Sequence, residues 1–293
     1  MKIKILIPVY NDFQSLSKLI TDINSVISNS NAEFSIIIIN DSSTEKTAID
    51  ISNVDKIRSI KILNMRENQG HARCIATGLK YIFEKEDFDY LIPMDGDGED
   101  RPEEISKFLE FLNYDNTKPI VGERIKRSEA FVFKLSYNIH KFITYVFTGQ
   151  TIKFGNYTCL PKSSVEKMVN EKATWSSFSG SLAKLEKNRS TIPSVRGFRY
   201  FGPSKMSFFN LIKHSLSINA VFKINVIIRS VLFFLIYFVL ILENLNYVTT
   251  IPLILVVIYV ISVLSISKRE NIKEYKNSLE NISDISEIKW MKK

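Results

Sequence analysis

Residues 90–104, YLIPMDGDGEDRPEE, join a short apolar run to a dense group of acids. Tyr90, Leu91 and Ile92 are typical of a buried strand, and five acidic residues follow between Asp95 and Glu103. Carboxylates packed this closely repel one another and resist burial. The stretch therefore predicts a strand that ends at a site for positive charge.

A helix is expected directly after this acidic turn. Pro102 suits a first helical turn, and the apolar residues beyond it recur at helical spacing: Ile105, Phe108, Leu109 and Leu112. In the turn itself, Asp95 and Asp97 are two residues apart and so point to one side of an extended segment. The glycines at 96 and 98 let a bulky ligand approach the backbone.

The acidic turn has three possible interpretations. A calcium-binding EF-hand loop fails because its sixth position is Asp100 rather than glycine and its twelfth is Ser106 rather than glutamate. A solvated acidic turn is the second interpretation. The third is a metal–diphosphate site, in which Mg²⁺ or Mn²⁺ is held by Asp95, Asp97 and the phosphate oxygens of a substrate. We favour the third.

The surrounding chain alternates strands with helices. Strands are expected at residues 3–9, 34–40, 57–64, 89–94 and 119–125, and helices at 13–27, 71–83 and 102–112. Strands that are apolar throughout predict an α/β fold with a mostly parallel sheet and helices on both faces. Ligands bind such sheets at the carboxyl ends of the strands. Polar clusters fall at those ends: residues 10–12, 40–45, 68–70 and 95–100.

Composition and motifs narrow the function classes. The 293 residues carry a formal charge of +8, which fits an anionic membrane surface, an anionic substrate or nucleic acid. Nucleic acid ranks last, because no Arg/Lys-rich arm or aromatic RNA-binding signature is present. Neither a G-x-G-x-x-G after the first strand nor a P-loop occurs. Cys74 and Cys159 are expected to be reduced, buried thiols, and residues 1–12 fit a first strand rather than a signal peptide.

The character of the sequence changes after about Thr191. Residues 206–225 predict an amphipathic helix that is either packed on the core or lies at a membrane interface. One face is apolar: Phe209, Ile212, Leu216 and Ala220. The other face is polar: Asn210, Lys213, His214 and Ser217.

Two apolar runs within residues 226–267 are each long enough to cross a bilayer, and buried core helices are the alternative. Lys223 and Arg229 flank the first run, and Lys268 and Arg269 follow the second. The loop between the runs has neither Lys nor Arg, so both ends of a transmembrane hairpin are expected in the cytoplasm. The expected order is a cytoplasmic catalytic domain (1–205), a juxtamembrane helix (206–225), the hairpin (226–267) and a cytoplasmic tail (268–293).

Four motifs, in order, resemble those of glycosyltransferase family 2, which has the GT-A fold. They are ILIPVYND (5–12), IINDSSTEKT (38–47), NQGHARCIATGL (68–79) and MDGDGEDRPEEI (94–105). Within the family the chain is similar to the polyprenyl-phosphate sugar synthases, such as dolichyl-phosphate mannose synthase. The segments GERIKR (122–127) and RYFGPSKMSFFNLIKHSL (199–216) extend the resemblance.

The resemblance implies the roles of individual residues. The donor nucleotide would contact Pro8, Tyr10, Asp12, Asp41, Asn68 and Gly70. Asp95 and Asp97 would bind Mg²⁺ or Mn²⁺ and the diphosphate and so be catalytic. Simple packing of Tyr10 and helix capping by Asn68 remain alternatives. Asn40 and Ser42 replace an Asp and a Gly of the family's nucleotide loop.

The largest departure is residues 155–158, Gly-Asn-Tyr-Thr, where relatives often carry Gly-Asp-Phe-Arg. Because that arginine is missing, other residues would have to pair with the acceptor phosphate. The alternative for each of them is that it is simply a solvated surface side chain. The candidates for the acceptor phosphate are Arg124, Arg127, Arg199, Ser204 and Lys205, with Lys205 also considered catalytic.

The expected reaction is inverting transfer of a sugar from a nucleotide diphosphate to a polyprenyl phosphate. A phosphate monoester is already largely ionised at neutral pH, so it needs cations rather than a general base. Two rivals remain: a transferase that extends a cell-surface saccharide or glycolipid, and a non-catalytic membrane partner in glycan assembly. A homo-oligomer is compatible with all three.

Overall fold

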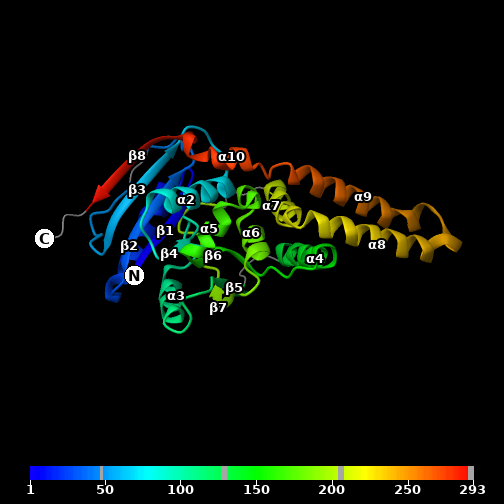
Figure 1. Ribbon diagram of the computed structural model, residues 1–293, viewed down its shortest axis with the longest axis horizontal. Helices are drawn as coiled ribbons and strands as arrows, with labels where there is room; N and C mark the ends of the chain where they lie inside the picture. The colour runs from blue at the N-terminus through cyan, green and yellow to red at the C-terminus, as the bar shows by residue number, and fades with distance from the viewer. Residues whose placement is uncertain (47–48, 127–130, 204–207, 290–293) are drawn as a thin grey trace.

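The computed structural model describes residues 1–46, 49–126, 131–203 and 208–289. Its centre is an eight-stranded sheet in the order β7-β5-β6-β4-β1-β2-β3-β8, with helices on both faces and a long helical hairpin projecting from one end (Figure 1). The predicted α/β class is confirmed.

The middle of the sheet is parallel. It contains β1 (Lys2–Val9), β2 (Glu33–Asn40), β3 (Ile57–Met65) and β4 (Tyr90–Pro93), which pair in the order β4-β1-β2-β3. Their apolar side chains form part of two hydrophobic cores, one on each face of the sheet. The first core is covered by α1 (Phe13–Val26) and α3 (Ile105–Leu112), and the second by α2 (His71–Lys85), α5 (Lys162–Val169) and α6 (Phe178–Leu185).

The rest of the sheet is mixed. β6 (Phe154–Pro161) runs antiparallel to β4 and to β5 (Ile120–Lys126), and β7 (Ser190–Val195) is parallel to β5. The prediction of a mostly parallel sheet therefore holds for the centre of the sheet, whereas the strands toward its edges also pair antiparallel. Sequence alone did not reveal this, because strand direction depends on how the connections cross the sheet.

Two helices form the projecting hairpin. α8 (Lys223–Ile241) and α9 (Tyr247–Ser267) each have a mean hydropathy of 2.5 over their most apolar stretch and are long enough to cross a membrane. Only 17% and 11% of those stretches are buried, which argues against a pair of core helices. α4 (Phe131–Thr148) and α7 (Phe208–Val221) pack at the base of the hairpin (Figure 1).

α7 differs from the expected amphipathic pattern. Its first half exposes Phe209 and Ile212, as an interfacial helix would, but its second half is buried against α6 and α9. Ser217, assigned to the polar face, is 1% exposed and donates a hydrogen bond to the Lys213 carbonyl. The polar face is lost there because neighbouring helices surround that part of α7.

The chain returns to the sheet after the hairpin. In the segment expected as a tail (268–293), residues 268–289 contain the short helix α10 (Ile272–Lys276) and then β8 (Ile282–Lys289), which pairs antiparallel with β3. β8 was missed because charges interrupt its apolar residues, a common feature of edge strands. Since β1 and β8 belong to one sheet, the amino-terminal domain and β8 lie on the same side of any membrane that the hairpin enters.

An ion cluster under the sheet provides a test of the fold. Glu86, at the end of α2, has an 8% exposed side chain and accepts hydrogen bonds from Lys4 at 2.8 Å and Lys61 at 2.6 Å. Burial raises the pKa of Glu86, but the two lysines outweigh burial and lower it. This stabilisation is therefore present above the unfolded pKa and lost as the pH falls through the folded one.

We expect Glu86→Ala to destabilise the protein by about 3 kcal/mol, because two lysines lose their buried partner. Thermal unfolding in detergent, followed by circular dichroism, measures the effect. Asp87→Ala is the matched control: its side chain is 75% exposed beside Lys2, so little change is expected. Equal melting temperatures for the two variants would contradict the assignment.

Candidate functional site

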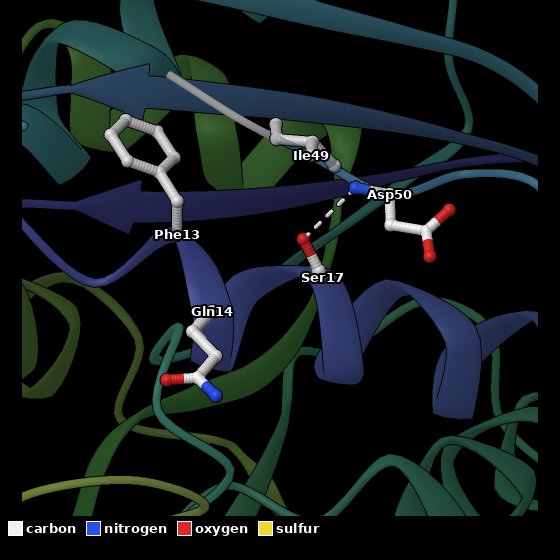
Figure 2. Close-up of a pocket in the computed structure, with 5 residues that line it drawn as sticks. All are labelled: Phe13, Gln14, Ser17, Ile49 and Asp50. Carbon is white, nitrogen blue, oxygen red and sulfur yellow. Dashed lines mark hydrogen bonds between the residues drawn. The ribbon is translucent and has the colours of Figure 1, made fainter. Parts of the chain in front are cut away.

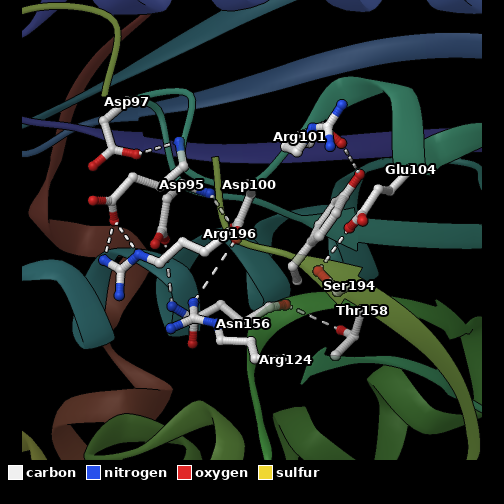
Figure 3. Close-up of polar contacts among 12 residues, drawn as sticks. Asp95, Asp97, Asp100, Arg101, Glu104, Arg124, Asn156, Thr158, Ser194 and Arg196 are labelled. Carbon is white, nitrogen blue, oxygen red and sulfur yellow. Dashed lines mark hydrogen bonds and ion pairs between the residues drawn. The ribbon is translucent and has the colours of Figure 1, made fainter. Parts of the chain in front are cut away.

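The acidic turn after β4 is held in shape by its own backbone. The Asp95 amide donates to Asp100 Oδ2 at 2.9 Å, and the Glu99 amide donates to Asp97 Oδ1 at 3.0 Å. Figure 3 shows these side chains gathered at one edge of the sheet. The turn thus concentrates carboxylates at the position that the sequence predicted for a cation.

The carboxylates disturb one another's ionisation. Burial and then the charge of Asp95 raise the pKa of Asp97 to about 6, and the same two causes raise that of Asp100 to about 8. The pKa of Asp95 is shifted in the opposite direction. Burial acts to raise its pKa, but His71 and Arg124 outweigh burial and lower it. The turn therefore favours any cation that can approach Asp97.

Cations reach the turn from two distant segments. Arg196 donates to Glu99 from its Nε at 2.8 Å, and Arg199 bridges Asp97 and Asp12 with its two terminal nitrogens. Arg124, on β5, lies 3.9 Å from Asp100 (Figure 3). Neutralisation of the acids thus depends on residues about 25 to 100 positions away in the chain.

Residues 196–200, here called the strap, also bind the turn through their backbone. The Gly197 amide donates to the Glu99 carbonyl at 2.8 Å, and the Tyr200 amide donates to that of Asp97 at 2.9 Å. Gly98 has φ of 87°, and a β-carbon there would lie 2.5 Å from the Tyr200 ring. Glycine at 98 is therefore needed for the strap to close over the turn.

Two further loops are joined beside the turn. Asn11, with φ of 50°, accepts hydrogen bonds from the Thr44 amide at 2.8 Å and the Glu45 amide at 3.2 Å. Positive φ is tolerated better by asparagine than by most residues. The loop after β1, which carries Tyr10 and Asp12, is thereby fixed to the loop after β2.

Asp41 organises the start of α2. Its two carboxylate oxygens accept from the amides of Gln69 at 2.7 Å and Gly70 at 2.9 Å, and Asn68 donates to its carbonyl. Asn68 does not cap the helix; the residue at that position is Gly70. The predicted contacts of Asp41, Asn68 and Gly70 with a nucleotide stay predictions, but the three residues form one structural unit.

Asn40 connects the β2 loop to the last strand. Its Nδ2 donates to Asn64 Oδ1 at 2.8 Å, and Asn64 in turn donates to Asp284 Oδ2 at 2.8 Å. The Ser43 amide donates to Asn40 Oδ1 at 3.1 Å. The side-chain amide of Asn40, which replaces the Asp of the family motif, is therefore oriented by β8, on the far side of the hairpin in sequence.

The predicted polar clusters meet at one edge of the sheet, and two of the predicted phosphate-binding arginines join them. Pro8 is buried in β1, whereas Tyr10 is 42% exposed. Arg127, Ser204 and Lys205 lie outside the residues that the structure describes. Their predicted roles are therefore not assessed by these contacts.

Sequence reasoning missed several contributors. His71 Nε2 lies 3.3 Å from Asp95 Oδ1 and 2.8 Å from Asn156 Nδ2. Arg196 and Asp100 were also not selected. The position of His71, directly after the Asn68–Gly70 loop, was the available signal, because a residue at the start of that helix faces the same sheet edge.

A surface pocket beside α1 contains no predicted site residue. It is lined by Phe13, Gln14, Ser17, Ile49 and Asp50, and the Asp50 amide donates to Ser17 Oγ at 3.1 Å (Figure 2). Phe13 directly follows Asp12, so the pocket borders the loop after β1. We assign it no ligand.

The donor set fits a metal that is shared with a substrate. In the described part of the chain, no group of three or more His, Cys, Asp or Glu side chains converges as a preformed metal cage. Asp95 and Asp97 instead supply two carboxylates, one with a raised pKa. One or two carboxylates are sufficient for Mg²⁺ when phosphate oxygens complete its coordination.

Comparison with known proteins identifies the class. Residues 4–178 match the family model Glycosyl transferase family 2, and this match covers more than half of the chain. The chain therefore belongs to glycosyl transferase family 2, and it is a glycosyltransferase. The match ends before the strap and the hairpin.

Three solved structures share the fold. Glucosyl-3-phosphoglycerate synthase from Mycobacterium tuberculosis, in complex with Mn²⁺ and uridine diphosphate, has a TM-score of 0.52 at 12% identity, over 76% of this chain and 79% of its own. Mannosyltransferase PcManGT from Pyrobaculum calidifontis, with GDP-Man and Mn²⁺, has a TM-score of 0.50 at 11% identity, over 94% and 74%. S. aureus TarS 1–349, with UDP-GlcNAc, has a TM-score of 0.50 at 13% identity, over 96% and 91%. At these identities the likeness shows the fold alone.

The pairing of Arg199 with Asp97 leads to a prediction for metal binding. A cation at Asp97 must replace the guanidinium, so Arg199→Gln should tighten Mn²⁺ binding to the substrate-free protein on the order of tenfold. Free Mn²⁺ measured by electron paramagnetic resonance gives the affinity directly. Arg196→Gln, which removes the partner of Glu99 instead, should change it much less. Unchanged or weaker binding in Arg199→Gln would contradict the proposed competition.

Proposed function

We propose that this glycosyltransferase transfers a sugar, with inversion, from a nucleotide diphosphate to a polyprenyl phosphate at the cytoplasmic face of a membrane. One observation carries the proposal. The two elements that bring cations to the acidic turn, the strap and β5, are each followed by a helix that packs at the base of the apolar hairpin: α7 after the strap and α4 after β5. The site and the apolar hairpin are thus directly connected.

The donor side uses the three loops at the edge of the sheet. Asp95 and Asp97 would hold Mg²⁺ or Mn²⁺ together with the donor diphosphate, and Tyr10, Asp12 and Pro8 would line the base and ribose pocket. When bound, the metal neutralises charge on the departing diphosphate. The relatives with bound UDP, UDP-GlcNAc and GDP-Man support a nucleotide-sugar donor but leave its base open.

The acceptor side uses cations. An ionised phosphate needs positioning more than deprotonation. Arg199 offers a buried Nε with no hydrogen-bond partner among the described residues, which is a donor suited to an anion. Arg124 lies 3.9 Å from Asp100 of the same turn. Arg127, Ser204 and Lys205, outside the described residues, complete the proposed phosphate site.

Chain connectivity and charge support the proposed placement in the membrane. β1 and β8 share a sheet, so both ends of the described chain lie on one side of the hairpin. Lys223, Arg229, Lys268 and Arg269 flank the hairpin, whereas residues 243–250 have no Lys or Arg. The positive-inside rule makes the side with the sheet cytoplasmic.

His71 favours a second candidate function. Its imidazole contacts Asp95, and its side chain is 41% exposed, so it has the chemistry and the access of a general base. A base is required when the acceptor is a sugar hydroxyl. A transferase that extends a cell-surface saccharide or glycolipid is therefore the rival function.

Product partition distinguishes these functions. Purified protein is incubated with Mn²⁺, radiolabelled UDP- or GDP-sugars and either polyprenyl phosphate or oligosaccharide acceptors. We expect label in the organic phase, dependent on the lipid phosphate and retained in His71→Gln at more than roughly a tenth of the wild-type rate, since general-base loss typically costs about 10²–10⁴-fold. Label in a water-soluble glycan, abolished by His71→Gln, would select the first rival. No turnover with either acceptor class would contradict both proposed reactions.

The metal role of the turn is tested by Asp97→Asn. We expect turnover to fall at least about a hundredfold, because the leaving diphosphate loses metal stabilisation. Glu103→Gln, in the 3₁₀ helix Pro102–Glu104 that follows the turn, is the matched control; its side chain is 63% exposed and only modest loss is expected. Near wild-type turnover of Asp97→Asn in excess EDTA would show that the site does not use a metal.

A further inference from the structure

A row of polar side chains crosses three strands, from β8 at the edge of the sheet to the end of β2. Asn40 and Asn64 are direct partners in the pairing of β2 with β3, and Asn64 and Asp284 are direct partners in the pairing of β3 with β8. Figure 1 shows β8 lying beside β3. Asn40 Nδ2 donates to Asn64 Oδ1 at 2.8 Å, and Asn64 Nδ2 donates to Asp284 Oδ2 at 2.8 Å. The Ser43 amide completes the row by donating to Asn40 Oδ1 at 3.1 Å.

The direction of these hydrogen bonds is fixed at both ends of the row. The backbone amide of Ser43 can only donate, and the carboxylate of Asp284 can only accept. Each side-chain amide between them must therefore turn its oxygen toward Ser43 and its nitrogen toward Asp284. Hydrogen bonds aligned in one direction polarise and strengthen one another. A carboxylate on β8 thus decides which atom Asn40 presents to each of its neighbours.

Burial makes the inner end of the row the more sensitive one. Asn40 is 5% exposed, whereas Asn64 is half-buried and Asp284 is exposed. A buried amide that faces the wrong way sets acceptor against acceptor or donor against donor, with no water to intervene. Asp284 can therefore be substituted at the surface, while the effect of its hydrogen bond is felt at a buried position.

The inner end of the row belongs to the loops assigned to the donor. Ser43 Oγ accepts a hydrogen bond from the Asn11 amide at 2.9 Å, which joins the loop after β2 to the loop after β1. Asp41, directly after Asn40, is bound at the same time to the loop before α2. The orientation of Asn40 therefore bears on all three loops.

The segment after the hairpin makes a second contact with these loops. Glu274, on α10, pairs with Arg73 Nη2 at 3.0 Å, and Arg73 Nη1 donates to Gln69 Oε1 at 3.0 Å. The Gln69 amide in turn donates to Asp41. Trp175 Nε1 donates to Glu274 Oε2 at 3.0 Å. α10 and β8 thus support the donor loops at two separate points.

We propose that Asp284 is a positioning residue for the donor nucleotide, because it fixes the direction of the Asn40 amide and thereby the loop after β2. Positions 40 and 284 are then coupled. An aspartate at position 40, as in the family motif, would set an acceptor against Asn64 Oδ1. Asn64 could turn its nitrogen inward only by presenting its oxygen to Asp284. The inference rests on the proposed function, which assigns these loops to the nucleotide.

Nucleotide binding tests the coupling in the full-length protein. Binding of UDP and of GDP, each with Mn²⁺, is measured in detergent by titration calorimetry, well below the melting temperature. We expect Asn40→Asp to weaken binding of the preferred nucleotide roughly tenfold, because a buried acceptor loses its donor. Asp284→Asn alone should change binding less than about twofold, since an asparagine oxygen still accepts from Asn64. The double variant should return to within about threefold of wild type, because Asn64 is then free to turn.

A reversed end group provides a second test at an exposed position, where folding is not at stake. Asp284→Lys places a donor opposite Asn64, so it should weaken nucleotide binding by itself and be rescued by Asn40→Asp. Glu280→Gln removes a charge from the same segment outside the row, and it should not rescue Asn40→Asp.

The outcomes separate the inference from the proposed function. Wild-type binding by both Asn40→Asp and Asp284→Lys would overturn the inference and leave the donor site in place. Double variants that bind no better than the single ones, or rescue by Glu280→Gln, would overturn it in the same way. Binding of neither nucleotide by the wild-type protein would overturn the donor side of the proposed function together with the inference.

Discussion

The repulsion among the carboxylates of residues 95–100 is the constraint on which the site depends. Buried acids cannot all ionise together, which is why the pKa values of Asp97 and Asp100 rise to about 6 and about 8. The fold offsets this repulsion with arginines from the strap and β5. A donor with a divalent metal would provide a stronger offset at the same place. The acidic turn is therefore organised around positive charge.

The strap links the acidic turn to the hairpin. It binds the turn through two backbone hydrogen bonds and two arginines, and α7 follows it. Asp284 on β8, which follows the hairpin in sequence, contacts Asn64, and Asn64 contacts Asn40 at the end of β2, where the next loop begins.

The membrane proposal and the chemical proposal support each other through geometry. A lipid phosphate lies at headgroup depth, and the cations that could hold it are carried by segments that enter helices packed on the hairpin. A soluble acceptor would not require the site to be held there. A hydroxyl acceptor would use the exposed His71 beside Asp95 as its general base. A phosphate acceptor would use the arginines instead.

The sequence by itself determined the layered α/β core, the catalytic class and the apolar hairpin, because each depends on local periodicity or on a contiguous motif. The apolar runs of β1 to β4 specify buried strands whatever their neighbours are, and the pair Asp95 and Asp97 within one turn predicts a cation site. Only the tertiary structure decided which charges meet. Arg199 and Asp97 are 102 positions apart, and Asp284 reaches Asn64 across 220. Such pairs follow from sheet order and from the return of β8, which no local pattern encodes. The burial of Ser217 has the same origin. The sequence pattern predicts that Ser217 faces solvent, but helices that are distant in sequence pack over it.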